Sequence, residues 1–251
     1  MTIVDLNSDM GESFGAWTMG DDASLLEVVS SANIACGFHA GDPSVIRRTV
    51  QLAARNGVAI GAHPSLPDLA GFGRRSMAVS AGEVYDLVLY QISALAGFAR
   101  VAGGRLHHVK AHGALYNMAA GDASLAAAIA AAVRDFDADL VLYGLAGSAL
   151  IDAGEAAGLS VAAEVFADRS YRKDGSLVPR SQPGAVIDEV ASAVAQGLDM
   201  VRDQRVLSVE GNWVPLRADT ICVHGDTPGA VTLARELRRA LATNGIEVRA
   251  P

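Results

Sequence analysis

The chain has 251 residues, of which 51% are hydrophobic and 19% charged, and this apolar content excludes a disordered chain. Its 20 basic and 28 acidic residues give a formal net charge of −8, without the basic surface on which nucleic-acid binders depend. Cys36 and Cys222 are too few for a disulfide scaffold, and no apolar run reaches the roughly 20 residues that cross a bilayer. We therefore expect a cytoplasmic protein that binds neither nucleic acid nor a membrane.

Short β-branched segments alternate with longer helical ones along the chain, which is typical of a parallel sheet built from βα units. Strands are predicted at residues 3–9, 33–38, 59–63, 108–112, 140–145, 161–166 and 220–224. Residues 205–216 alternate in polarity around a central turn and predict a β-hairpin inserted before the last strand. We interpret residues 1–251 as one domain. Periodicity alone leaves a closed barrel and an open doubly wound sheet as alternatives.

Capping signals mark the ends of the helices between these strands. Ser24 with Glu27, and Ser80 with Glu83, have the spacing of a capping box. Asp42-Pro43 and Thr227-Pro228 are typical helix starts, in which a capping side chain precedes a proline. Left-handed glycines are expected to end four helices, at Gly57, Gly104, Gly158 and Gly245.

Histidines occur where predicted strands end, since His39, His63, His112 and His224 each follow or close a different strand. In parallel α/β folds, ligands bind at this end of the sheet. Other polar residues occupy the same positions: Asn7, Asp9, Glu12, Asp42, Asp68, Lys110, Glu164, Asp168, Arg169 and Asp226. Any one of them could serve as a helix cap or a satisfied polar group. Together they predict a shared site.

Lysine is rare in this chain, which uses arginine for nearly all of its positive charge and has lysine only at positions 110 and 173. Lys110 lies in an apolar predicted strand beside His112, which favours a functional ammonium group. The alternative is a structural ion pair with Glu164 or Asp9. Neither lysine stands in a Gly-Lys-Ser/Thr sequence, so a phosphate-binding P-loop is excluded.

Two further features have both a functional and a structural interpretation. Arg74 and Arg75 follow a glycine-rich loop and could bind a carboxylate, or could be a solvated pair. Cys36 precedes His39 by three positions, so a thiolate and its base are conceivable, but a small core residue is the favoured interpretation.

The polar residues lie within long motifs: DLNSDMGESFG at 5–15, NIACGFHAGDP at 33–43, GAHPSLPDLAGFGRR at 61–75, VKAHGALYN at 109–117, EVFADR at 164–169 and ICVHGDTPG at 221–229. Over nearly the whole chain these motifs closely resemble the LamB/YcsF family. Ala111 stands where that family usually has proline, and Ser8 where cysteine is common. The resemblance implies a seven-stranded (β/α) barrel of the glycoside hydrolase and deacetylase type, and so decides between barrel and open sheet.

The resemblance also implies ATP-dependent hydrolysis of 5-oxo-L-proline (pyroglutamate) to L-glutamate, by a 5-oxoprolinase in which the chain works with B and C subunits. ATP, with magnesium, is expected to be bound mainly by those partners, because this chain lacks a P-loop. No organic cofactor is expected. A homo-oligomer is compatible with the sequence, which does not specify the oligomeric state.

Hydrolysis of a lactam requires an activated water, a stabilised carbonyl oxygen and a protonated leaving nitrogen. We expect Asp9 or Glu12, with His39, to act as the general base. Lys110 and His112 would stabilise the developing oxyanion or a phosphoryl oxygen. Arg169, or Arg74 and Arg75, would bind the substrate carboxylate. The other expected substrate-binding residues are Asn7, His63 and Glu164, of which Asn7 and His63 would orient the reacting groups.

Two alternative functions remain. In a metal-dependent deacetylase or amidase, Asp9, His39 and His63 would bind zinc and leave an open position for water. Such ligands come from separate strands, so sequence spacing leaves the presence of a metal open, and we favour a metal-independent reaction. In the other alternative the chain is a non-catalytic assembly module of the complex, although so many ionisable residues at the strand ends argue against it.

Overall fold

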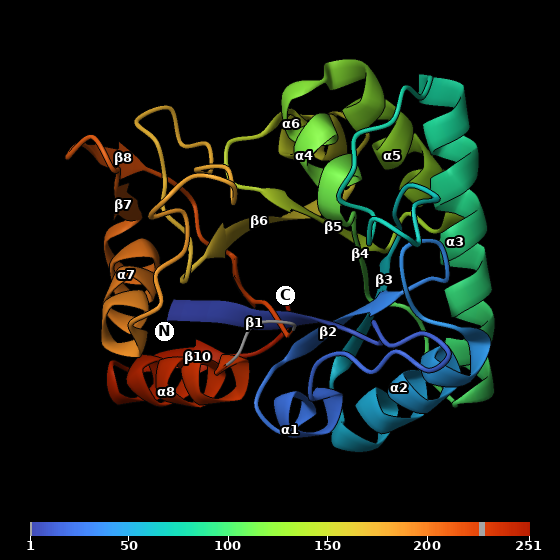
Figure 1. Cartoon of the computed structure of the whole chain (residues 1–251), viewed down its shortest axis with the longest axis horizontal. Coiled ribbons are helices and arrows are strands. Elements are labelled where there is room, and N and C mark those ends of the chain that lie inside the picture. The colour runs from blue at the N-terminus through green and yellow to red at the C-terminus, as the bar shows by residue number, and fades with distance from the viewer. Residues whose placement is uncertain (1, 226–228) are drawn as a thin grey trace.

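The computed structural model describes residues 2–225 and 229–251, and a closed ring of parallel strands lies at its centre (Figure 1). The strands follow one another around the ring in chain order, and the last pairs with the first: β1 (Thr2–Met10), β2 (Ser31–Ala35), β3 (Ala59–His63), β4 (His108–Lys110), β5 (Val141–Leu145), β6 (Ser160–Phe166) and β9 (Thr220–Val223). This closure confirms the predicted (β/α) barrel. The second predicted strand was placed slightly too late, and the fourth ends at Lys110.

Within the described residues, three further strands lie outside the ring. β10 (Ile246–Val248) pairs in parallel with the start of β1, and the sequence did not predict it. β7 (Arg205–Leu207) and β8 (Trp213–Pro215) pair antiparallel, so residues 205–216 form a hairpin before β9. The guanidinium of Arg205 lies over the Trp213 ring, 4.1 Å from its centre, and this contact joins the two strands of the hairpin.

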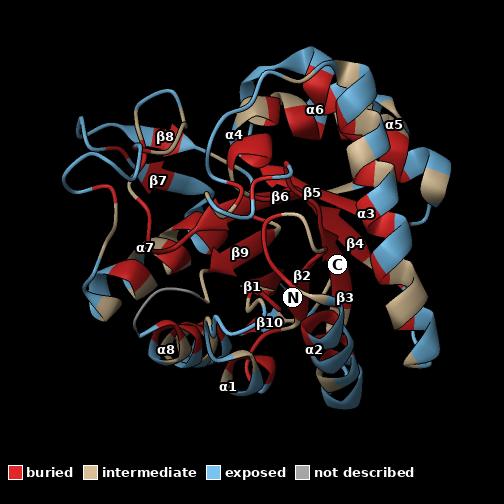
Figure 2. Ribbon diagram, turned by 45° about the vertical axis from the view of Figure 1, so that its right-hand side comes forward, coloured by how far each residue is buried: buried red, intermediate tan, exposed pale blue. Residues whose placement is uncertain are grey.

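Helices surround the ring, with buried residues on their inner faces and exposed residues outside (Figure 2). They are α1 (Asp22–Leu26), α2 (Pro43–Asn56), α3 (Ala81–Val101), α4 (Gly113–Gly121), α5 (Ala123–Phe136), α6 (Ala149–Ala156), α7 (Val190–Asp203) and α8 (Ala230–Thr243). In α8, Ala234, Leu237 and Leu241 are fully buried at helical spacing. Among the described residues, no helix has the length and apolar character needed to span a membrane.

The capping residues follow the sequence in most places. Ser80 and Glu83 form the predicted capping box, and Asp42 caps α2 ahead of Pro43. The prediction of Ser24 as a cap is wrong, because α1 starts earlier and the carboxylate of Asp21 accepts the Ser24 N–H.

The predicted glycine ends are found at Gly57, Gly158 and Gly245, all of which have positive φ. The prediction for Gly104 is wrong, since Gly103 takes the left-handed conformation after α3. The predicted start at Thr227-Pro228 lies outside the described residues.

The inside of the barrel is polar, unlike the branched apolar layers usual in (β/α) barrels. The buried Asp5 carboxylate accepts hydrogen bonds from Ser31, Tyr143 and Thr220. A second buried network joins the side chains of Asn7, Asn33, His108 and Glu164. The polar side chains of these two networks are thereby paired with one another, and they support the strand ends from within.

Candidate active site

A cavity of about 480 Å³ lies at the carboxyl ends of the barrel strands. Its lining comes from β1, β3, β4 and β6, from the start of α4, and from the segments that follow β3, β6 and β9. The polar and aromatic residues in the lining are Asp9, His63, Arg74, Lys110, His112, Tyr116, Asn117, Phe166, Arg169, Arg180 and His224. The strand ends therefore converge on one cavity, as parallel βα units require.

The ammonium group of Lys110 has three close partners at this cavity. Its Nζ lies 2.8 Å from Glu164 Oε1 and 3.0 Å from Asp9 Oδ1, and it donates to Cys222 Sγ at 3.1 Å. Burial would lower the pKa of Lys110, but Asp9, Cys222 and Glu164 together raise it well above its usual value. Lys110 is therefore a fixed ammonium charge, and both structural partners considered from the sequence are present.

Asp9 stands at the edge of the same cavity, with 12% of its side chain exposed. Burial would raise the pKa of Asp9, but the nearby His63 and Lys110 hold it well below its usual value. Its Oδ2 lies 3.4 Å from His63 Nε2, while Nδ1 of that ring lies 2.7 Å from the Lys110 carbonyl oxygen. Asp9 is thus an ionised carboxylate at the cavity, with one oxygen next to Lys110 and the other next to His63.

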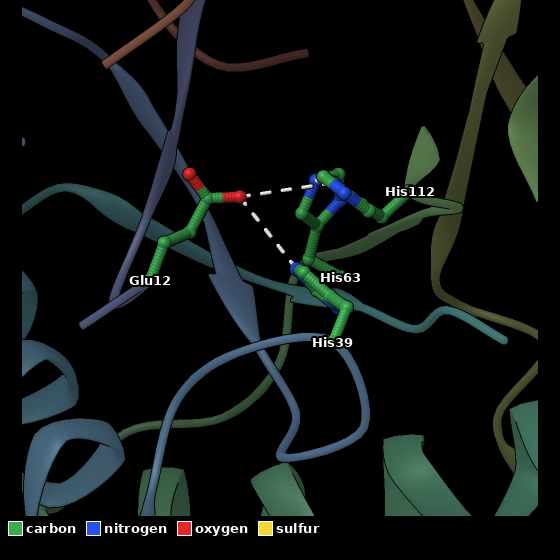
Figure 3. A group of neighbouring side chains, drawn as sticks. All are labelled: Glu12, His39, His63 and His112. Atoms are coloured by element: carbon green, nitrogen blue, oxygen red, sulfur yellow. Dashed lines mark hydrogen bonds and ion pairs between the residues drawn. The ribbon is translucent and has the colours of Figure 1, made fainter. Parts of the chain in front are cut away.

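A second group brings Glu12 and His39, which do not line the cavity, together with His63 and His112, which form part of its wall (Figure 3). Glu12 Oε1 is 3.6 Å from His39 Nε2 and 3.7 Å from His112 Nδ1, and the rings of His39 and His112 stack at 3.8 Å. Burial lowers the pKa of His39 well below its usual value and that of His112 to about 3. With His63, these residues form a group of three imidazoles and one carboxylate, a set that could hold a metal ion.

His224 contributes a further ionisable group to the cavity wall. Its Nδ1 lies 3.3 Å from Asp168 Oδ2, and its ring stacks on Phe166 with the ring centres 5.3 Å apart. Burial raises the pKa of Asp168, but the hydrogen bond and charge of His224, together with the charge of Arg180, outweigh this and leave it lowered. The result is an imidazole oriented by an ionised carboxylate, an arrangement suited to proton transfer.

The predicted site residues fall into four places. Six line the cavity: Asp9, His63, Arg74, Lys110, His112 and Arg169. Asn7 and Glu164 are fully buried in the barrel interior and contact Lys110 from within. Glu12 and His39 lie behind the wall. Arg75 turns away to pair with Asp68, and 67% of its side chain is exposed.

The structure adds residues to which the sequence assigned no role. Tyr116 donates a hydrogen bond to Glu164 at 2.8 Å, and its position one helical turn beyond His112 could have indicated it. His224 was predicted to lie at the end of a strand, but no role was given to it. Arg180 comes from the long loop after β6, where no periodic signal exists. Arg169 lines the cavity while donating to the Ala185 and Val178 carbonyls, which anchors that loop.

The LamB/YcsF family model matches residues 4–251 of the chain. The chain belongs to the LamB/YcsF family. It is 64% identical over 247 residues to the A subunit of 5-oxoprolinase from Bordetella parapertussis, a match that covers 98% of each protein. Relatives with the same name occur in other bacteria, including Bacillus subtilis at 58% identity over 98% of this chain and 96% of that protein.

Solved structures agree with this assignment. A lactam utilization protein from Thermus thermophilus superposes with a TM-score of 0.95 at 49% identity, covering all of both chains. A family 4 carbohydrate esterase from Streptomyces lividans superposes with a TM-score of 0.53 at 13% identity, over 98% of this chain and 91% of that one. The second likeness shows only that the barrel is of the deacetylase type.

Proposed function

We propose that this chain is the A subunit of a 5-oxoprolinase, and that its cavity holds 5-oxo-L-proline while the lactam ring is opened to L-glutamate. The reaction is coupled to ATP hydrolysis and needs B and C subunits, which bind most of the ATP and magnesium. The names of the relatives described above support this role and imply a complex of several different chains. Two free, buried thiols fit a cytoplasmic location.

One observation carries the proposal: an ammonium and an ionised carboxylate lie 3.0 Å apart at a cavity that is also lined by three arginines. The substrate is a small anion with a carbonyl that must be polarised. Its carboxylate suits Arg74, Arg169 and Arg180, and its ring carbonyl suits the fixed charge of Lys110.

The chemistry assigns one step to each group. Asp9 accepts a proton from the attacking water, whose oxygen bonds to the ring carbonyl carbon. Lys110 stabilises the negative charge that develops on the carbonyl oxygen or on a phosphoryl group attached to it. The bond from carbon to the ring nitrogen then breaks, and His224, oriented by Asp168, donates a proton to that nitrogen.

Reconstitution tests the proposal. Glutamate release from 5-oxo-L-proline and ATP is measured with the three subunits mixed and with each omitted in turn. We expect release to require this chain, and Asp9→Asn to lower the turnover of the assembled complex about a hundredfold or more. Arg134→Ala, on the outer face of α5, is the control. Undiminished glutamate release without this chain would instead support the assembly-module alternative.

A further inference from the structure

His63 and His112 each have one ring nitrogen committed to a backbone carbonyl. His63 Nδ1 lies 2.7 Å from the carbonyl oxygen of Lys110, and His112 Nε2 lies 2.9 Å from that of Phe72. A carbonyl oxygen can only accept, so each of these nitrogens carries a hydrogen. In the neutral rings the opposite nitrogens, His63 Nε2 and His112 Nδ1, therefore present lone pairs.

Those two lone-pair nitrogens lie 3.0 Å apart and face each other. Two acceptors at this distance repel unless a positive ion lies between them, either a proton or a metal ion. The rings are 1% and 4% exposed, so little water reaches the space between these two nitrogens to weaken the repulsion. The backbone hydrogen bonds have the form usual for metal-binding histidines, in which the second ring nitrogen donates to a carbonyl that fixes the tautomer.

His39 supplies an independent observation. It is 1% exposed, and among the described residues neither of its ring nitrogens has a hydrogen-bond partner. Its Nε2 points toward Glu12 Oε1 at 3.6 Å, on the same side as the nitrogens of the other two rings (Figure 3). A buried imidazole with no hydrogen bond is costly, and a bound cation would remove this cost.

We propose that Glu12, His39, His63 and His112 form a binding site for a divalent transition-metal ion, with Zn²⁺ the best match to three imidazoles and a carboxylate. The four ligand atoms lie within 4.8 Å of one another, and the separations given above run from 3.0 to 3.7 Å. A tetrahedral zinc ion with bonds of about 2.0–2.1 Å needs its ligands about 3.3–3.4 Å apart.

Binding requires one movement. The rings of His39 and His112 are stacked with only 8° between their planes, so their lone pairs do not converge on one point. The His39 ring must turn relative to His112, and it has no hydrogen bond to break when it does so. The ion would then lie at the cavity wall, because His63 and His112 belong to both the wall and the cluster.

A second group of candidate ligands, Asp9, Cys222 and His224, is not the site. The ammonium of Lys110 lies 3.0 Å from the Asp9 carboxylate and 3.1 Å from the Cys222 sulfur, and it would repel a metal cation. The two groups also differ in a measurable way, since only this second one contains sulfur. Zinc bonds to sulfur are about 2.3 Å long, against about 2.0–2.1 Å for nitrogen.

The test uses the full-length purified chain, stripped with a chelator and titrated with ZnCl₂ or CoCl₂. We expect one equivalent of metal per chain, a visible Co²⁺ spectrum of tetrahedral type, and zinc X-ray absorption that shows nitrogen and oxygen neighbours without sulfur. Glu12→Gln and His39→Asn should each weaken metal binding about a hundredfold. Loss of a residue that only hydrogen-bonds to a metal ligand typically costs about 10–100-fold in affinity, and loss of a ligand should cost at least as much. The matched control is His107→Asn, at the opposite end of β4.

Three results would each overturn the site, and the first two are no stoichiometric binding of Zn²⁺ or Co²⁺ by the wild-type chain and a sulfur neighbour in the absorption spectrum. Unchanged affinity in Glu12→Gln and His39→Asn would do the same. The wild-type spectra need no variant, so the test survives a variant that fails to fold. Metal binding is measured without substrate or partner chains, so its failure and a failure of the proposed reaction are distinguishable.

Discussion

Replacing Lys110 by methionine tests both the stability and the chemistry of the cavity. Methionine keeps much of the side-chain volume but removes the charge that pairs with Asp9 and Glu164. Breaking a buried ion pair by removing one partner costs about 3–5 kcal/mol. Glu164 keeps its hydrogen bonds from Asn7 and Tyr116, and Asp9 has 12% of its side chain exposed to water. We therefore expect a loss near the lower limit, about 3 kcal/mol.

Urea unfolding followed by circular dichroism measures this loss, and glutamate release by the reconstituted complex measures turnover. Turnover should fall about 10²–10³-fold, the usual cost of losing one donor to a developing oxyanion. The double variant Lys110→Met/Glu164→Gln removes a buried charge and should recover part of the stability without recovering turnover. Recovery of both together would mean that the loss of activity was only a loss of folded protein.

The same variant has a pH signature. The folded-state pKa of Asp9 is held below its usual value, so its stabilising contribution is present above about pH 4 and is lost as pH falls through the lowered pKa. The stability difference between wild type and Lys110→Met should therefore shrink as the solution is acidified below about pH 4. The chain offers a matched control in Lys173→Met, its other lysine, in an exposed turn. Wild-type stability together with wild-type turnover in Lys110→Met would refute the assignment.

Three other predictions concern separate parts of the molecule. A Cβ at Gly61 would collide with the His108 ring, so Gly61→Ala should destabilise the barrel by about 1–3 kcal/mol in urea unfolding. The cost should be clearly smaller in a His108→Ala background, and an equal cost in both backgrounds would contradict the contact. Burial raises the pKa of Cys36 to about 12, so this thiol should stay unreactive toward a disulfide reagent at mildly alkaline pH until the chain is unfolded; rapid labelling of the native protein would revive the nucleophile hypothesis. Arg74→Gln should raise KM for 5-oxo-L-proline about tenfold or more with a smaller change in kcat, and a change confined to kcat would show that Arg74 does not bind the substrate carboxylate.

The order of strands was predictable because each is a short β-branched segment between helices with their own caps. The strand-end rule then placed Asp9, His63, Lys110 and His112 together, since parallel strands end on the same side of a barrel. It could not say which polar residues face the cavity and which lie beneath it. Glu164 precedes the end of β6 by two residues, and that offset places it in the barrel interior.

Neighbouring residues in loops were harder still to assign. Arg74 and Arg75 are adjacent and chemically identical, yet one lines the cavity and the other pairs with Asp68. The loop conformation decides between them: Phe72 and Gly73 both have positive φ, and a Cβ at Gly73 would collide with Ser65 and His112. Such a turn depends on the packing of three distant segments, which no local sequence pattern contains.

The two acids considered as alternative bases prove to have different surroundings. Asp9 is held by Lys110 and His63 on the cavity side, whereas Glu12 lies among three imidazoles behind the wall. His63 joins the two groups, because its Nε2 is 3.4 Å from Asp9 Oδ2 and 3.0 Å from His112 Nδ1. A cation bound behind the wall would take up the lone pair of that nitrogen and place positive charge near Asp9, which would favour the ionised form of the carboxylate. Occupancy of one group should therefore alter the basicity of the other through a single ring.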